Sequence, residues 1–298
     1  MSRSLPALLL LLLLLVACST PGATQTPARS PSTVADASPP PADPRFTLHC
    51  NLPIESKAGG EGFLTFPGGD FTPTSALLGA VTEMGGYCTQ TYDWTYRKWL
   101  PVMPKDISPD GSKYAYQNND RILKVVDVAT GTVSAIPGSA GWNLIAAAND
   151  GVYVHTFSGH TGLWFLRYAG GDPAQVSNAG YSYQAIGGGY AYVSAGKDDQ
   201  TLLRVDLKTG AATKFADPPA EVLGFDLSGV PVVGLASSTL LMPAPHKQTV
   251  VIPGQRPQSF VVGAPHGIWL PLLPRMFLRT PDGRVPRVTD RTGLAHGA

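Results

Sequence analysis

Short apolar runs separated by glycine-containing turns dominate the chain beyond Phe46. Runs such as residues 152–154 and 190–193 follow directly after a turn glycine, as expected for β-strands that leave tight turns. The turn glycines are separated by 40, 38, 40 and 38 residues, at Gly111, Gly151, Gly189, Gly229 and Gly267. A spacing this regular indicates an internal repeat.

A second series of turns lies between the first, beginning with Gly131, 20 residues after Gly111. Its other members lie at residues 168–171, 205–210 and 279–283. Each repeat therefore contains four strands in about 40 residues, which is the size of one β-propeller blade. A β-sandwich also has many short strands, but it lacks this fixed period. The pattern predicts an all-β fold of four-stranded antiparallel blades.

Residues 108–116 read Ser-Pro-Asp-Gly-Ser-Lys-Tyr-Ala-Tyr, and residues 125–131 read Val-Val-Asp-Val-Ala-Thr-Gly. These two segments resemble the repeat of the TolB-like (WD-like) β-propeller family. In that family the Asp-Gly turn joins the inner two strands of a blade, and the Asp-x-x-Thr-Gly turn joins the outer two. The second turn recurs at residues 206–210, whereas Gly188 and Ser228 replace the aspartate of the first turn in later repeats.

The start of the domain is similar to the opening of uncharacterised propeller-type lipoproteins. Here Asp93 stands where Asp127 stands in the next repeat. The segments that carry this resemblance are residues 50–54, 62–67, 92–93 and 98–102. Together the two resemblances cover about residues 50–290 and imply a β-propeller carried on a bacterial lipoprotein.

The repeat also predicts the number of blades. Residues 107–290 supply five, and residues 62–67 with 92–102 supply one more. Six blades of about 40 residues need about 240 residues, and residues 46–298 contain 253. We therefore expect a six-bladed propeller over residues 46–298, with seven blades as the alternative. Residues 46–48 are a candidate strand for closing the ring.

Residues 1–17 have the pattern of a lipoprotein signal peptide. Arg3 precedes an apolar stretch at residues 5–17, interrupted only by Pro6, which is shorter than the ~20 residues that a membrane-spanning helix needs. The stretch ends in Leu-Val-Ala-Cys, which resembles the bacterial lipobox and makes Cys18 the expected lipidated N-terminus. An ordinary secretory signal with a chance cysteine is the alternative. We expect an extracytoplasmic protein, lipid-anchored to a bacterial membrane.

The segment at residues 18–45 is predicted to be a disordered tether. Of the 26 residues from 19 to 44, 20 are Ser, Thr, Pro or Ala and seven are Pro. Such a composition cannot bury enough apolar surface to offset the cost of ordering. Extended as polyproline II, it would reach roughly 80 Å at ~3.1 Å per residue.

The three cysteines of the chain are consistent with an extracytoplasmic location. With Cys18 lipidated, Cys50 and Cys88 remain, and an extracytoplasmic compartment permits a disulfide between them. Two buried free thiols are the alternative. No further Cys or His lies at ligand spacing near either cysteine, so no metal site and no cofactor are expected.

Composition and charge exclude one fold class and one class of partner. The 33 Gly and 28 Pro residues disfavour long helices, so a helical bundle is excluded. Charged residues are only 14% of the chain and the formal net charge is +1, so no nucleic-acid partner is expected. We expect a monomer whose partners are the membrane, through the lipid, and an envelope or extracellular protein or peptide.

In a propeller blade, the loops before the first strand and between the second and third strands emerge on one face. The first set includes residues 138–143, and the second includes residues 118–121. Aromatic, basic and acidic side chains on such loops suit a polar ligand or a peptide at the pore mouth. The candidate binding residues are Trp142, Tyr181, Tyr183, Glu221 and Arg256. Alternatively, Trp142 and Tyr181 pack over the adjacent strands.

No catalytic residue is assigned. The chain has no Gly-x-Ser-x-Gly motif, and no Glu lies near His155 and His160. The favoured function is a binding or scaffolding module for a protein, peptide or polar ligand. A propeller enzyme of lyase or hydrolase type, with Glu221 and Asp226 as its obvious carboxylates, and an envelope-integrity component are the alternatives. Whether the protein is an enzyme is left open, because one fold hosts many functions.

Overall fold

The computed structural model describes residues 50–56, 60–66, 70–74, 91–156, 161–179, 182–195, 201–217, 220–226, 228–235, 238–245, 247–253, 261–264, 267–272, 275–279 and 287–289. These residues form β-strands and one short 3₁₀ helix, η1, at Pro104–Asp106. No helix in these ranges has the length and apolar character needed to cross a membrane. Cys18, Cys88 and the side chain of Cys50 lie outside the description, so lipidation and the Cys50–Cys88 disulfide stay predictions.

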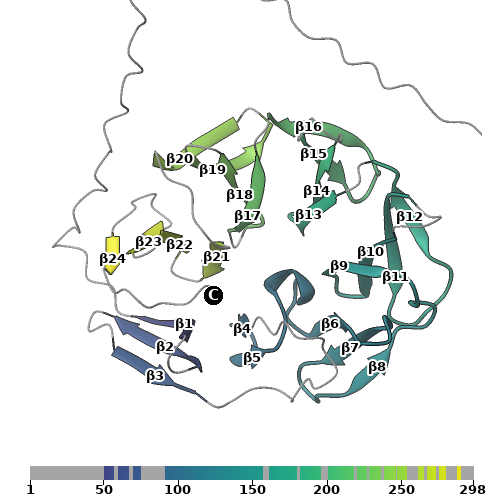
Figure 1. Cartoon of the computed structure of the whole chain (residues 1–298), viewed down its shortest axis with the longest axis horizontal. Helices are drawn as coiled ribbons and strands as arrows, with labels where there is room; N and C mark the ends of the chain where they lie inside the picture. Colours follow the sequence, from purple (N-terminus) through teal and green to yellow (C-terminus); the bar gives the residue numbers. More distant parts are fainter. Residues whose placement is uncertain are drawn as a thin grey trace, which may run out of the picture. The chain divides into compact units, whose positions relative to one another are not determined.

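Two small antiparallel sheets come first along the chain (Figure 1). The first contains β1 (Cys50–Ser56), β2 (Gly60–Phe66) and β3 (Asp70–Pro73). The second is the hairpin of β4 (Thr91–Asp93) and β5 (Lys98–Leu100). Aromatic side chains of the two sheets are in contact. Phe63 of β2 packs edge to face against Tyr92 of β4, with ring centroids 5.1 Å apart.

Five sets of strands follow, one for each glycine of the predicted repeat, and within each set neighbouring strands are antiparallel. The first set is β6 (Lys113–Gln117), β7 (Leu123–Asp127) and β8 (Val133–Ala135); the second is β9 (Asn143–Ala147), β10 (Gly151–His155), β11 (Leu163–Arg167) and β12 (Ala174–Ser177); the third is β13 (Ser182–Gly187), β14 (Tyr190–Ala195), β15 (Thr201–Asp206) and β16 (Ala212–Ala216); the fourth is β17 (Glu221–Phe225), β18 (Pro231–Leu235), β19 (Ser238–Ala244) and β20 (Lys247–Pro253); the fifth is β21 (Val261–Ala264), β22 (Gly267–Leu272), β23 (Arg275–Arg279) and β24 (Arg287–Thr289).

These sets are the blades of a propeller. The first strand of each set contacts the first strand of the next, in the order β6, β9, β13, β17 and β21 (Figure 1). The last of these contacts is a short parallel pairing of Gly224 with Val261 and Phe225 with Val262, which joins the fourth and fifth blades into one eight-stranded sheet. The all-β fold of mostly antiparallel blades is therefore confirmed.

The expectation of six blades, or of seven, is wrong, because the residues that the structure describes form five. Five blades were expected from residues 107–290, and the described residues of that range form them. The sixth was to be assembled from the segments before Ile107. In the part of the chain that the structure describes, those segments instead form the separate sheets β1–β3 and β4–β5, which do not pair with each other. Both segments form strands, but among the described residues no ladder of hydrogen bonds joins β1–β3 to β4–β5.

The hydrophobic core lies between adjacent blades. Strand β14 shows why: Ala191 and Val193 pack in a cluster with residues of the second blade, whereas Tyr192 packs in a cluster with residues of the fourth. Alternate side chains of a strand point to opposite faces of its sheet, so one strand can contribute to two interfaces. The apolar runs that follow the turn glycines, such as residues 190–193, therefore bury both faces.

Aspartates close the tight turns at one end of the blades. Asp127 Oδ1 accepts a hydrogen bond from the Thr130 backbone N–H at 2.9 Å, and Asp206 Oδ1 accepts one from Thr209 N–H at 2.8 Å. Asp93 Oδ1 accepts one from Tyr96 N–H at 2.7 Å. This shared i to i+3 bond confirms that Asp93 stands in the position of Asp127. We call this end of the blades, with the turns at Asp127, Asp206 and Gly229, the turn face.

Glycines allow successive turns to approach backbone to backbone on this face. Gly188 and Gly229 have positive φ, 60° and 74°. A Cβ added at Gly229 would lie 2.8 Å from Gly188 Cα, and one added at Gly188 would lie 2.5 Å from Gly229 O. Glycine is required here both for its backbone conformation and for the space it leaves.

Gly229→Ala is expected to lower the free energy of unfolding by about 2–4 kcal/mol, combining left-handed strain with the clash against Gly188. Gly189→Ala is the matched control. Its φ is 82° and a Cβ there meets nothing within 4 Å, so only the strain of about 1–2 kcal/mol applies. Urea unfolding followed by tryptophan fluorescence measures both. Equal losses would contradict a constraint from the neighbouring blade.

Candidate functional site

Loops of the first and second blades meet at the end opposite the turn face. The Gln117 side-chain amide donates to the Trp142 backbone O at 2.8 Å, and Arg121 Nη2 donates to Asn143 Oδ1 at 3.3 Å. The Asn143 amide donates in turn to the backbone O of His155 at 3.4 Å. We call this group of five residues the loop face. Residues 118–121 and residues 138–143, which were expected to emerge on one face, are in contact through Arg121 and Asn143.

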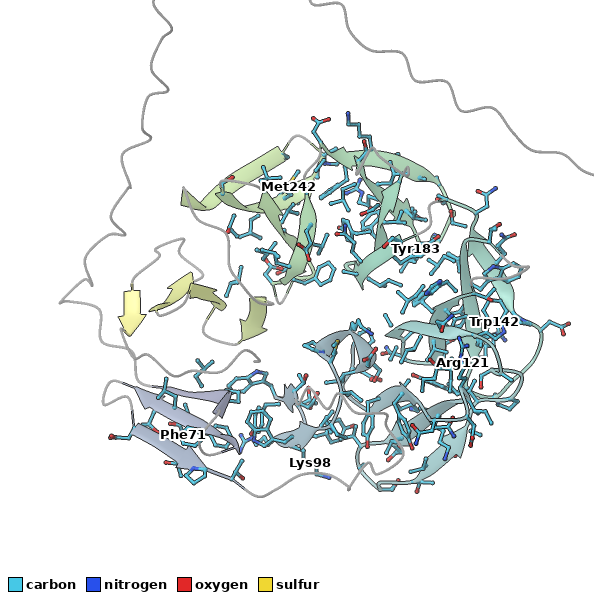
Figure 2. The ribbon with its side chains drawn as sticks, viewed as in Figure 1. Phe71, Lys98, Arg121, Trp142, Tyr183 and Met242 are labelled. Atoms are coloured by element: carbon cyan, nitrogen blue, oxygen red, sulfur yellow. The ribbon has the colours of Figure 1, made fainter. Side chains whose placement is uncertain are left out.

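Arg121 lies in the turn between β6 and β7 with a φ of 60°, which is uncommon for a residue other than glycine. The turn is closed on both sides of it. Its N–H donates to Asn118 O at 3.0 Å, and Asn118 Oδ1 accepts from the N–H of Ile122 at 2.9 Å. The Gln117 amide also donates to Arg121 O at 3.3 Å, so one side chain binds the Arg121 and Trp142 backbones. Figure 2 shows the positions of Arg121 and Trp142.

Trp142 is a packing residue at the base of the loop face. Its side chain is only 7% exposed and belongs to the core cluster between the first and second blades. Its ring centroid lies 5.7 Å from that of Trp164. The alternative in which Trp142 packs over adjacent strands therefore describes its position, while a role in ligand binding stays a prediction.

The other predicted binding residues are distributed over later blades. Tyr183 lies in β13, where its hydroxyl donates to Ala179 O and burial raises its pKa to about 12. Glu221 is exposed at the start of β17. Tyr181 and Arg256 lie outside the described residues. The structure thus brings Trp142 together with Arg121 and Asn143, which were not singled out from the sequence.

Gln184 makes a corresponding connection between the third and fourth blades. Its Oε1 accepts a hydrogen bond from the backbone N–H of Val222 at 2.9 Å, and its Nε2 donates to Ser194 Oγ at 2.6 Å. A glutamine within an apolar strand is the only sequence signal for this contact. It resembles the bond from Gln117 to Trp142, because in both cases a side-chain amide satisfies a backbone group of the next blade.

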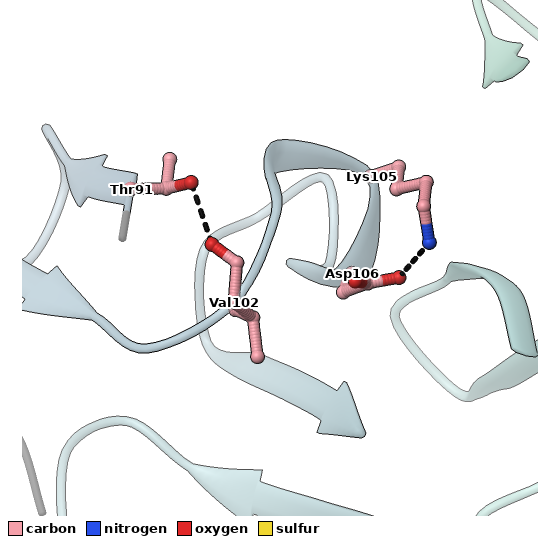
Figure 3. Close-up of polar contacts among 4 residues, drawn as sticks. All are labelled: Thr91, Val102, Lys105 and Asp106. Atoms are coloured by element: carbon pink, nitrogen blue, oxygen red, sulfur yellow. Dashed lines mark hydrogen bonds and ion pairs between the residues drawn. The ribbon is translucent and has the colours of Figure 1, made fainter. Parts of the chain in front are cut away.

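A charged pair lies on η1, which packs against β9 (Figure 3). Lys105 Nζ is 2.6 Å from Asp106 Oδ1, and the Asp106 side chain is 13% exposed whereas the Lys105 side chain is 37% exposed. Before η1, Thr91 Oγ1 donates to Val102 O at 2.6 Å and ties the segment to β4. Burial raises the pKa of Asp106, and the neighbouring ammonium of Lys105 opposes that shift.

The carboxylates that an enzyme was expected to use do not converge. Glu221 begins β17 and Asp226 follows its end, so about 16 Å of extended chain separates them at ~3.3 Å per residue. Asp226 Oδ1 accepts hydrogen bonds from the backbone N–H groups of Ser228 and Val230, at 2.9 and 2.8 Å. Its carboxylate therefore closes the turn between β17 and β18. Among the described residues there is no group of three Cys, His, Asp or Glu side chains placed to hold a metal.

No protein-family model matches the sequence. No curated protein matches it either. Solved structures with a similar fold include the protein assigned as TolB from Agrobacterium tumefaciens, with 13% identity and a TM-score of 0.44 over 63% of this chain and 80% of that chain. Another is an oligogalacturonate lyase in complex with manganese, with 12% identity and a TM-score of 0.44 over 82% and 73%. A third is from a nidogen/laminin complex, with 9% identity and a TM-score of 0.45 over 81% and 98%. At these identities the likeness extends to the fold alone.

Asp106→Asn is expected to make stability less dependent on pH. A folded-state pKa raised above the usual 3.8 means that the folded protein binds more protons than the unfolded chain, so stability falls as the pH rises from 3.8 through the folded pKa. The free energy of unfolding of the variant, relative to the wild type, should therefore increase from pH 4 towards neutrality in urea titrations. Asp172→Asn, at an exposed carboxyl, is the control. A constant difference for Asp106→Asn across this range would contradict the prediction.

Proposed function

We propose that this protein is a lipid-anchored, extracytoplasmic β-propeller that acts as a binding or scaffolding module for a protein, peptide or polar ligand. The observation that carries the proposal is the loop face. There, side-chain hydrogen bonds hold exposed polar loops of two blades in fixed positions over a buried core. Loops positioned by a rigid scaffold are common binding surfaces, since a preorganised surface loses less entropy on association.

The use of the acidic side chains supports a binding role. Asp127, Asp206 and Asp226 each accept hydrogen bonds from backbone N–H groups of their own turns. These bonds hold the pKa values of Asp127 and Asp206 below their usual range. All three carboxylates stabilise the turns in which they lie.

The N-terminal sequence supports the anchor. Residues 5–17 with Cys18 match a lipoprotein signal, and the Pro-rich residues 19–44 would hold the propeller away from the bilayer. Two or three acyl chains retain a protein on a membrane firmly, since each buried CH₂ contributes about 0.8 kcal/mol.

Cys18→Ser tests the anchor. The substitution removes the sulfur that would carry the lipid, so the protein should be released into the soluble fraction or remain unprocessed. Fractionation of bacterial cells and intact-mass measurement report the two outcomes. Ser32→Ala, a substitution in the tether away from the lipobox, is the control. A Cys18→Ser protein that stays processed and membrane-bound would rule the anchor out.

Site-specific photocrosslinking tests the binding face in the full-length protein on cells. A benzophenone amino acid at Asn119, exposed on the loop between β6 and β7, should give a discrete adduct with a partner. The same amino acid at Lys208, exposed in the Asp206 turn on the turn face, is the control and should not. Equal labelling from both positions, or labelling from Lys208 alone, would count against the loop face as the binding surface.

A further inference from the structure

We propose that Arg121 is an anchor for a carboxylate on an acidic segment of a protein partner. The proposal rests on the proposed function and identifies the chemistry that the loop face recognises. It starts from an unusual combination in one residue: Arg121 is exposed, has a left-handed backbone and has a side chain that is held by the next blade.

The backbone of Arg121 is held in an unfavourable conformation by its neighbours. A φ of 60° brings the Cβ of a residue other than glycine close to the following carbonyl. The structure maintains it through the bond from Arg121 N–H to Asn118 O and the bond from the Gln117 amide to Arg121 O. Strain of this kind concentrates at ligand-binding positions, where it fixes the direction of a side chain.

The side chain is directed as well. Arg121 Nη2 donates to Asn143 Oδ1, and the Asn143 amide is itself directed by the backbone O of His155. Asn143 Oδ1 is the one acceptor for the guanidinium within the described part of the chain, so its remaining N–H donors face solvent or a partner. The nearest acid in sequence, Asp120, accepts a bond from the Asn118 side chain at 3.5 Å.

A guanidinium oriented in this way suits a carboxylate. Its planar set of N–H donors matches the two oxygens of a carboxylate, and charge-assisted hydrogen bonds are stronger than neutral ones. Holding the side chain in place beforehand reduces the entropy lost when the pair forms.

An acidic peptide fits this surface better than an acidic saccharide. Saccharide recognition gains from an open aromatic face, whereas the two tryptophans that pack together at this end are Trp142, which is only 7% exposed, and Trp164, which is half-buried. The exposed loop residues Asn119 and Arg121 instead offer an amide and a guanidinium to an extended chain, while the Asp120 carboxylate beside them disfavours a second acidic side chain at that position.

Calorimetric titration of the full-length protein in detergent, with a tetraglutamate peptide at low salt, tests the proposal. Arg121→Gln is expected to weaken binding about tenfold or more, and added NaCl should weaken wild-type binding. Arg121→Lys keeps the charge but loses the planar donors, so its affinity should lie between the two. Arg167→Gln removes an exposed arginine at the turn-face end of β11 and should bind within about twofold of the wild type.

Arg121→Gly separates binding from folding. Glycine adopts this φ without a Cβ, so the variant should melt no lower than the wild type and still fail to bind tetraglutamate. Unchanged binding by Arg121→Gln, or an equal loss with Arg167→Gln, would overturn the proposal. Binding of tetragalacturonate but not tetraglutamate, dependent on Arg121, would overturn the assignment to a peptide. Photocrosslinking from Asn119 that persists in Arg121→Gln would leave the binding module standing while this anchor fails.

Discussion

The third and fourth blades approach each other backbone to backbone at the turn face, and the packing around strand β14 depends on that approach. Where Gly188 meets Gly229 there is no room for a Cβ on either residue, and both have positive φ. Turns this close bring the sheets near enough for one strand to bury its two faces against two neighbours, as Tyr192 and Val193 of β14 do. A core distributed between blades follows from this spacing and needs no helical layer.

The two ends of the blades are built from different chemistry. At the turn face, aspartates accept hydrogen bonds from backbone N–H groups of their own turns, and glycines supply the positive φ that the turns need. At the loop face, amide side chains such as Gln117 connect one blade to the backbone of the next. Arg121 stands out there because its backbone carries strain that hydrogen bonds within its own turn maintain.

Much of the fold was predictable because its signals are local. The Asp127 and Asp206 turns bond three residues along the chain, and the turn glycines are set by the φ of single residues. Such features repeat with the period of the blade and can be read from spacing. The sixth blade was not predictable in the same way, since β1–β3 and β4–β5 have strand-forming sequences and only their pairing shows that they are separate sheets. Trp142 was correctly placed at a loop, but an aromatic residue beside a strand has the same sequence signature whether it is exposed or packed.

The sequence alone therefore determined the all-β class, the blade period, the turn chemistry and the expected membrane address. Tertiary structure decided the number of blades, the partnership of Arg121 with Asn143 and the burial of Asp106 on η1. The physical reason is the range of the interactions. A turn is specified by residues within four positions of each other. The contacts between blades join residues that are farther apart in sequence, 22 positions for Arg121–Asn143 and 25 for Gln117–Trp142. Whether such residues meet depends on how the blades pack.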